Sequence, residues 1–130
     1  MKIDSHHHFW KYDPVRYSWM NERMEVLKKD YQPNDLLGEI ERVGIDGVVS
    51  VQADQSMQET NELLEHAAQH DFIRGVVGWF PLADPAIEDI LAEYSGNPLL
   101  KGVRHVVQDE PDDRFILGDA FNEGIRKLKK

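Results

Sequence analysis

The sequence contains no cysteine, which excludes a disulfide-stabilised scaffold, a cysteine-ligated zinc site and a cysteine nucleophile. It contains no apolar run near the roughly 18 residues that a membrane-spanning helix needs, and its first residues form no apolar signal-peptide segment. We therefore expect a soluble, cytoplasmic protein that has no membrane partner.

Positive charge is scarce relative to negative charge. The 130 residues include 15 Lys and Arg against 24 Asp and Glu, which gives a formal net charge of −9. An acidic surplus of this size disfavours non-specific binding to nucleic acid or to an anionic membrane. Apolar residues make up 41% of the chain and charged residues 30%, which is typical of a globular domain rather than a disordered chain.

The chain alternates between short apolar runs and amphipathic segments. Residues 2–7 are a predicted strand, and three Val-rich runs follow at 47–53, 75–80 and 102–107. The Val-rich runs lack a clean in/out alternation, which favours strands buried on both faces of a parallel sheet. The glycines that open them lie 28 and 27 residues apart, which is the length of a strand–helix unit.

Amphipathic segments with helix start and stop signals separate these strands. Asn34 precedes an apolar face that ends at Gly44, and Ser56 and Glu59 have the spacing of a capping box. Asp84 precedes a proline, as at the start of a third helix. A last amphipathic segment carries the apolar residues Phe121, Ile125 and Leu128.

We expect a single α/β domain of four strand–helix units, at about 1–46, 47–74, 75–101 and 102–130. Such units form either an open doubly wound sheet or half of a (β/α)8 barrel, which uses about 250 residues, or about 31 for each unit. The first unit contains a long insertion, residues 9–33, for which a functional cover and plain packing both stay open. Its aromatic residues are Trp10, Tyr12, Tyr17, Trp19 and Tyr31.

Residues 4–8, Asp-Ser-His-His-His, are the sharpest feature of the sequence. Regular strand alternation places Asp4, His6 and His8 on one face, opposite Ser5 and His7. Two imidazoles at i and i+2 can ligate one zinc or similar divalent ion, although a catalytic zinc uses about three ligands and an open position. The alternative is a chance cluster. A purification tag is disfavoured because the run contains only three consecutive histidines and lies in a predicted strand.

Polar and aromatic side chains fall at the ends of the Val-rich runs, where parallel α/β folds place their active sites. A buried side-chain amide with its hydrogen bonds satisfied is the alternative for Gln52, and core packing is the alternative for Trp79. Arg104 interrupts an apolar strand and therefore requires a bound anion or a carboxylate partner such as Asp54. His105 has the opposite parity to Arg104, so at most one of the two points into a barrel.

Four segments, in their order and spacing, resemble the amidohydrolase-related sugar lactonases, the L-fuconolactonase and L-rhamnonolactonase group. Together they cover nearly the whole chain. The segments are residues 3–10, residues 51–53 with 59–60 and 63–64, residues 75–79, and residues 101–106 with 108–111.

The resemblance implies the N-terminal half of a (β/α)8 barrel that hydrolyses a sugar-acid lactone, with a divalent metal, expected to be zinc, in many members. The family's further histidine ligands and its Asp general base would lie beyond Lys130. We therefore expect the chain to be incomplete as a catalyst, and its catalytic residues stay unassigned. The resemblance implies the metal ligands His6 and His8 and a substrate wall of Gln52, Trp79, Arg104 and His105, with a lactone oxygen or a carboxylate opposite Arg104.

Two other functions stay open at this point. One is a non-catalytic half barrel that binds or assembles through its open sheet edges, with itself or with a separate second half. The other is a related metal-independent lactonase or a decarboxylase. The chain carries no basic and aromatic pattern typical of nucleic-acid binding, so we expect a small-molecule lactone as the ligand.

Overall fold

The computed structural model describes residues 1–129 as strands alternating with helices. The strands are β1 (Ile3–His7), β2 (Gly47–Val51), β3 (Ile73–Gly78) and β4 (Leu100–Val103). The α-helices are α1 (Pro33–Val43), α2 (Met57–Gln69), α3 (Ile87–Tyr94) and α4 (Asp119–Lys127). Short 3-10 helices are η1 (Glu22–Leu27), η2 (Val107–Asp109) and η3 (Phe115–Leu117).

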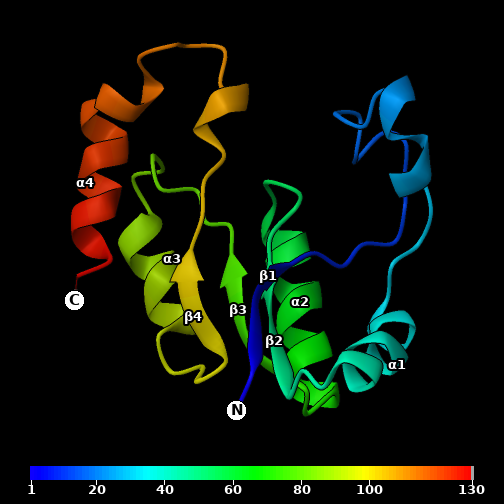
Figure 1. Cartoon of the computed structure of the whole chain (residues 1–130). Coiled ribbons are helices and arrows are strands. Elements are labelled where there is room, and N and C mark those ends of the chain that lie inside the picture. The colour runs from blue at the N-terminus through cyan, green and yellow to red at the C-terminus, as the bar shows by residue number, and fades with distance from the viewer. Residues whose placement is uncertain (130) are drawn as a thin grey trace.

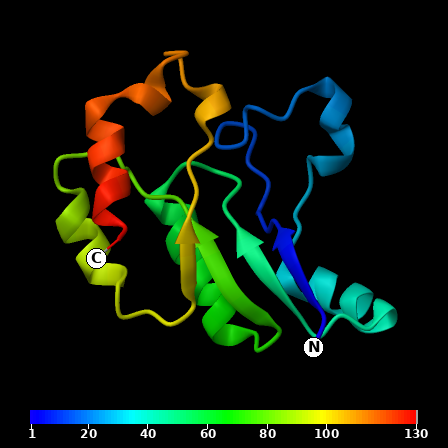
Figure 2. The same ribbon diagram turned by 60° about the vertical axis from the view of Figure 1, so that its left-hand side comes forward.

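All four strands are parallel and lie side by side in the order of the chain, β1-β2-β3-β4. Helices α1 to α4 gather on one side of this sheet (Figures 1 and 2). A doubly wound sheet reverses its strand order at a switch point, whereas a sequential order without reversal is that of a (β/α)8 barrel. The predicted α/β class is therefore confirmed, and the topology is that of half a barrel.

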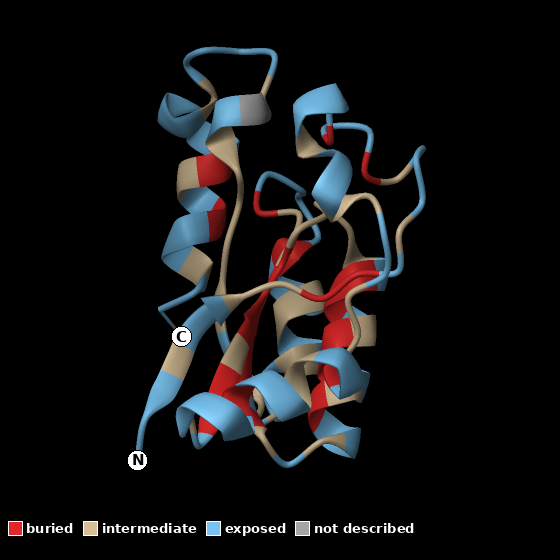
Figure 3. Ribbon diagram, turned by 45° about the vertical axis from the view of Figure 1, so that its right-hand side comes forward, coloured by how far each residue is buried: buried red, intermediate tan, exposed pale blue. Residues whose placement is uncertain are grey.

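The main core lies between the sheet and helices α1 and α2. Val48 of β2 and Val76 of β3 are fully buried, and they pack in one cluster with Ile40 of α1 and Leu63 of α2. β-Branched residues suit the pleated surface, and both helices turn an apolar stripe towards it. Figure 3 shows buried residues concentrated in the central strands and on α2, whereas β1 is largely exposed.

A second core joins α3 and α4, and it contains Phe80, Ile87 and Phe121. α3 begins at Ile87, later than the Asp84-Pro85 pair predicted. α4 approaches the backbone of the β3–α3 connection so closely that a Cβ on Gly124 would lie 1.9 Å from the carbonyl oxygen of Leu82. This approach requires glycine.

The strand boundaries differ from the predicted ones by a few residues. β3 and β4 begin two residues before Gly75 and Gly102, which were expected to open them. Both glycines lie inside the ladder, where Gly75 aligns with Val49 and Gly102 with Val77. β2, β3 and β4 also end earlier than predicted, so the polar residues after them lie on loops rather than in the sheet.

The helix signals are partly confirmed. α1 begins at Pro33, one residue before the predicted cap Asn34, and it ends at Gly44, whose φ of 69° lies in the left-handed region that favours glycine. The hydroxyl of Ser56 accepts the N–H of Glu59 at 3.2 Å and caps α2 as predicted. The Glu59 carboxylate, however, bonds to the preceding loop rather than back to the cap.

The insertion between β1 and α1 lies beyond the carboxyl ends of the strands, as does the segment that follows β4 (Figures 1 and 2). It has a small core of its own, which contains Trp10, Tyr17 and Met20. An antiparallel bridge between Trp10 and Tyr31 joins its two ends. The insertion is therefore a packed structure, in which most of the aromatic residues serve the packing role.

No helix within residues 1–129 is long and apolar enough to cross a membrane. The cytoplasmic location stays a prediction.

Candidate functional site

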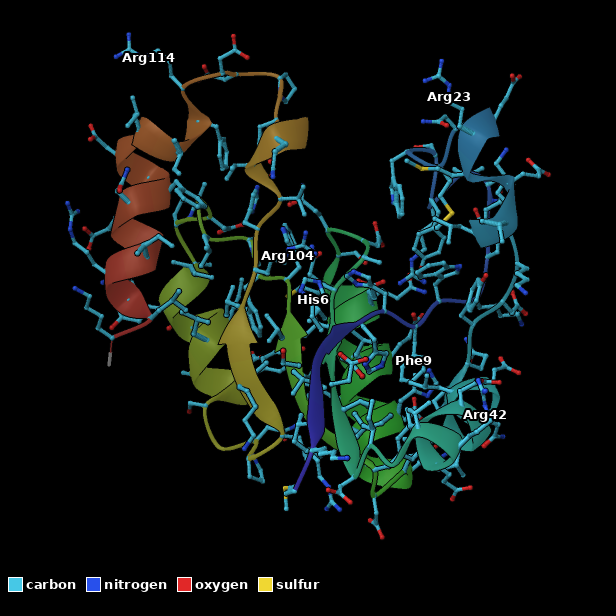
Figure 4. The ribbon with its side chains drawn as sticks, viewed as in Figure 1. His6, Phe9, Arg23, Arg42, Arg104 and Arg114 are labelled. Carbon is cyan, nitrogen blue, oxygen red and sulfur yellow. The ribbon has the colours of Figure 1, made fainter. Side chains whose placement is uncertain are left out.

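The three histidines at positions 6–8 lie at the carboxyl end of β1, where Figure 4 labels His6, and their side chains point to opposite sides of the sheet. The rings of His6 and His8 meet edge to face, with centroids 4.9 Å apart. His7 turns away from them, and its Nε2 lies 3.3 Å from the hydroxyl of Ser50 in β2. The strand register shifts between Asp4 and His7, so Asp4 does not join the pair as regular alternation predicts. Its carboxylate accepts the backbone N–H of His6 instead.

His8 is oriented by the neighbouring strand. Its Nδ1 lies 2.8 Å from the carbonyl oxygen of Val51, and because a carbonyl only accepts, Nδ1 carries the proton. This leaves the lone pair of Nε2 for a metal or a substrate. Burial lowers the pKa of His8, and the positive charge of Arg104 acts in the same direction. Burial also lowers the pKa of His7, to about 4. Both imidazoles are therefore held in the neutral form.

His6 and His8 together offer two imidazoles for a metal ion. A catalytic zinc takes three protein ligands and keeps one open position. Within residues 1–129, no group of three or more His, Asp or Glu side chains comes together as a ligand set. The donor chemistry of the pair fits zinc as part of a larger ligand set, and residues 1–129 bring no third ligand to it.

Arg104 and Gln52 come together from the ends of β4 and β2. Nη1 of Arg104 donates to the backbone carbonyl and to the side-chain Oε1 of Gln52, at 3.1 Å each. Asp54, the carboxylate expected to meet Arg104, is instead bound by Arg16 at 2.8 Å. The two acceptors on Gln52 are neutral and occupy one nitrogen of Arg104, so the guanidinium keeps donors for a further oxygen.

Gln52 carries an unused hydrogen-bond donor. The residue is fully buried, and its Nε2 has no partner among the described residues. Since Oε1 must face the Arg104 donor, the orientation of the amide is fixed. A buried donor without a partner costs about 1–3 kcal/mol, so a ligand oxygen at this position would be favourable.

Gln52 lines a pocket of about 510 Å³ at the carboxyl ends of the strands, which we call the strand-end pocket. It brings three of the predicted site residues together, namely His8, Gln52 and Arg104. Two residues of the insertion also line it, Ser18 and Trp19, together with Asp54.

The other three predicted residues, His6, Trp79 and His105, do not line this pocket; His6 contacts His8, and Trp79 and His105 meet each other. The indole N–H of Trp79 donates to Nδ1 of His105 at 3.2 Å, and Nε2 of His105 lies 2.6 Å from a carboxylate oxygen of Glu110. The His105 ring stacks on Phe115 and packs against Phe121 of α4. Arg104 and His105 thus bond to different partners, and because β4 ends at Val103, strand parity does not set their directions. A substrate contact by Trp79 or His105 stays a prediction.

A larger pocket of about 720 Å³ lies between the insertion and α2. Its charged groups bind one another, because Arg16 donates to Asp54 at 2.8 Å and to Glu62 at 3.0 Å. Charged groups that already bind each other have fewer hydrogen bonds to give a ligand than the Nε2 donor of Gln52, which has no partner among the described residues. We therefore take the strand-end pocket as the candidate site.

Glu59 supports this site in a way that the sequence analysis missed. One carboxylate oxygen accepts the N–H groups of Ala53 and Asp54 at 2.8 Å each, and the other accepts the hydroxyl of Tyr17 at 3.4 Å. Glu59 therefore ties the β2–α2 loop to the insertion. Burial raises the pKa of Glu59 to about 7, against the effect of its N–H partners. An acidic residue in the first turn of a helix after a polar loop was the available signal.

Known proteins resemble this chain in sequence and in fold. The amidohydrolase family matches residues 3–129. An L-fucono-1,5-lactonase of Burkholderia multivorans is 38% identical over 130 residues, and one of Burkholderia ambifaria is 30% identical over 115 residues. A crystal structure of a Burkholderia multivorans amidohydrolase with bound zinc superposes with a TM-score of 0.92 at 37% identity.

The chain spans less than half the length of these relatives. The matches cover 99% and 88% of this chain but only 44% and 40% of the two lactonases. The superposition likewise covers 99% of this chain and 45% of the zinc-containing protein. In fold, the chain therefore corresponds to about half of a (β/α)8 barrel.

Proposed function

The chain belongs to the amidohydrolase family, and from that premise we propose that it forms the N-terminal half of the active site of a sugar-acid lactone hydrolase. The observation that carries this proposal is the likeness to an L-fucono-1,5-lactonase over 99% of the chain. The strand-end pocket supports it, because its polar side chains suit an oxygen-rich ligand.

Arg104 and Gln52 are the residues to which we assign lactone binding. The lactone offers ring, carbonyl and hydroxyl oxygens, all of which accept hydrogen bonds. The buried Nε2 of Gln52 needs an acceptor, and the guanidinium of Arg104 has donors beyond the one that Gln52 uses. A lactone oxygen between them would satisfy both groups and orient the ring against the ends of β2 and β4.

We assign His6 and His8 to a divalent metal, with zinc the expected ion. Such an ion polarises a lactone carbonyl and acidifies water. The contribution of the chain itself is to hold His8 in one tautomer through the carbonyl of Val51, while burial lowers the pKa of His8 and favours its neutral form. Among residues 1–129 we assign no general base.

The first test is hydrolysis of L-fucono-1,5-lactone by the chain, followed by acid release at constant pH with added zinc. Because residues 1–129 supply two of the expected metal ligands and no assigned general base, we expect a rate above the spontaneous one but far below that of a complete site. Arg104→Met should lower kcat/KM by at least about tenfold, since it removes a charged hydrogen bond. Arg114→Met is the matched control, because Arg114 is exposed and far from Arg104 in Figure 4, and it should leave the rate unchanged.

The outcomes separate the candidate functions. Hydrolysis that a chelator does not affect would assign His6 and His8 to hydrogen bonding and favour a metal-independent lactonase. A rate equal to the spontaneous one, together with no binding of the sugar ring in calorimetric titration, would overturn the enzymatic proposal. It would favour a half barrel that acts by assembly, for which the open edges of β1 and β4 are the supporting observation.

A further inference from the structure

Trp19 departs from the packing of the insertion that carries it. Its neighbours Tyr17 and Met20 are 1% and 5% exposed and belong to the insertion core, whereas Trp19 is 43% exposed. Burying an indole would be favourable, and a core lies directly beside it. The chain instead directs this side chain out of the core and onto the wall of the strand-end pocket.

Two residues shortly before Trp19, Arg16 and Tyr17, attach the insertion to the rest of the chain. Arg16 binds Asp54 and Glu62, and Tyr17 donates to Glu59, so two successive residues attach the insertion to the β2–α2 loop and to α2. The side chain of Arg16 is 20% exposed, which makes these ion pairs stronger than pairs in open solvent. The position of Trp19 is therefore set by contacts that its own side chain does not make.

The strand-end pocket has two walls of different chemistry. Gln52 and Arg104 provide hydrogen-bond donors, whereas Trp19 provides a flat apolar surface. A sugar ring has the matching asymmetry, with oxygens around its edge and C–H bonds on its faces. An indole face covers such a ring face without competing for its hydroxyl groups.

We infer that Trp19 is the aromatic wall on which the ring of the sugar lactone stacks, with Arg16 and Tyr17 as its positioning residues. This inference rests on the proposed function and deepens it, because it names the apolar face of the sugar ring as the recognised element. The stacking contact is the same before and during hydrolysis. Its loss should therefore raise KM and leave kcat nearly unchanged.

The test is binding of L-fucose, which keeps the six-membered ring but has no acyl carbon to hydrolyse. Calorimetric titration should give a Kd about tenfold higher for Trp19→Ala than for the parent, and a Kd within about threefold of the parent for Trp19→Tyr, which keeps an aromatic face. Indole emission should change on binding in the parent and stay constant in Trp19→Tyr. Val26→Ala, at a 70% exposed apolar position of the same insertion, should bind as the parent does.

The results distinguish failure of the inference from failure of the proposed function. If the parent binds L-fucose and hydrolyses the lactone while Trp19→Ala behaves like the parent in both assays, the stacking role is wrong and the function stands. If the parent neither binds the sugar nor hydrolyses the lactone, the proposed function fails and the inference with it. Equal melting temperatures of parent and variants show that a weaker Kd does not reflect unfolding.

Discussion

Glu59 is the buried carboxyl group whose ionisation should be most visible in the stability of the chain. Its pKa rises from 4.5 to about 7 on folding, and burial is the main cause. Between these two pH values the folded chain binds more protons than the unfolded chain, so its free energy of unfolding falls as the pH rises. Over the whole shift this loss is at most about 3 kcal/mol.

Glu59→Gln tests this assignment, because the amide oxygen can still accept the N–H groups of Ala53 and Asp54 but does not titrate. We expect urea unfolding to show a gain of the variant over the parent that grows from about pH 5 to about pH 8. His7 titrates in the opposite sense at acid pH, but it is present in both proteins and cancels in the difference. A difference that is independent of pH would contradict the raised pKa.

The residues of the candidate site were predictable where backbone periodicity alone decides the direction of a side chain. His6 and His8 lie together as strand parity predicts, whereas Arg104 and His105 lie beyond the end of β4 and bond to Gln52 and Glu110. The partner of Arg104 was not predictable, since Gln52 is 52 residues away and competes with Asp54 on the same loop. That Asp54 goes to Arg16 depends on how the insertion folds back.

At the scale of elements, the insertion is attached through Arg16. We expect Arg16→Met to lower the free energy of unfolding by about 1–3 kcal/mol, because it leaves the half-buried Asp54 and its neighbour Glu62 without their cation. Arg42→Met is the matched control, since Arg42 pairs with Glu39 on an exposed helix face and should have no measurable effect.

Urea unfolding gives the free energy of unfolding of both variants, and limited proteolysis gives the rate at which the insertion is cleaved. In Arg16→Met, cleavage within residues 9–33 should become faster than in the parent, whereas cleavage in Arg42→Met should follow the parent. Equal effects of the two substitutions would mean that the Arg16 pairs contribute no more than an exposed ion pair.

Gly124 determines how α4 docks. Gly124→Ala forces a Cβ onto the carbonyl group of Leu82, so we expect a loss of about 1–3 kcal/mol and detachment of α4. Gly38→Ala in α1 is the control, because nothing lies within 4 Å of the added Cβ, and it should stabilise the chain by about 0.5–1 kcal/mol. Thermal unfolding separates the two, and a gain from both substitutions would contradict the close approach.

The elements themselves were predictable because each follows from a local pattern. Val-rich runs became strands, and amphipathic segments became helices on one side of them. The strand starts were wrong because Gly75 and Gly102 were interpreted as boundaries. In the sheet, a Cβ on Gly75 would lie 2.5 Å from the side chain of Lys101 on β4. That requirement arises between strands and cannot be read from either strand alone.

At the scale of the whole molecule, the sheet has two open edges and one side that helices α1 to α4 do not cover (Figure 2). A closed barrel has no edges, because each strand pairs on both sides. In the described chain, β1 and β4 each pair with one neighbour only, and β1 is largely exposed. Unpaired backbone groups along such edges favour pairing with another chain, whereas the net charge of −9 opposes close approach of copies.

We expect edge pairing to prevail when salt screens this charge, so that the isolated chain self-associates. In sedimentation experiments at about 0.15 M salt, the average mass should rise above 15.1 kDa as the protein concentration increases.

Ile3→Lys places a charge on the exposed edge strand β1, where Ile3 is 39% exposed, and should reduce association. Val43→Lys adds the same charge at a 57% exposed position on α1, away from both edges, and should act only through net charge. Equal effects of the two lysines would place the contact elsewhere, and a constant mass of 15.1 kDa at every concentration would show that the half barrel is stable with its edges open.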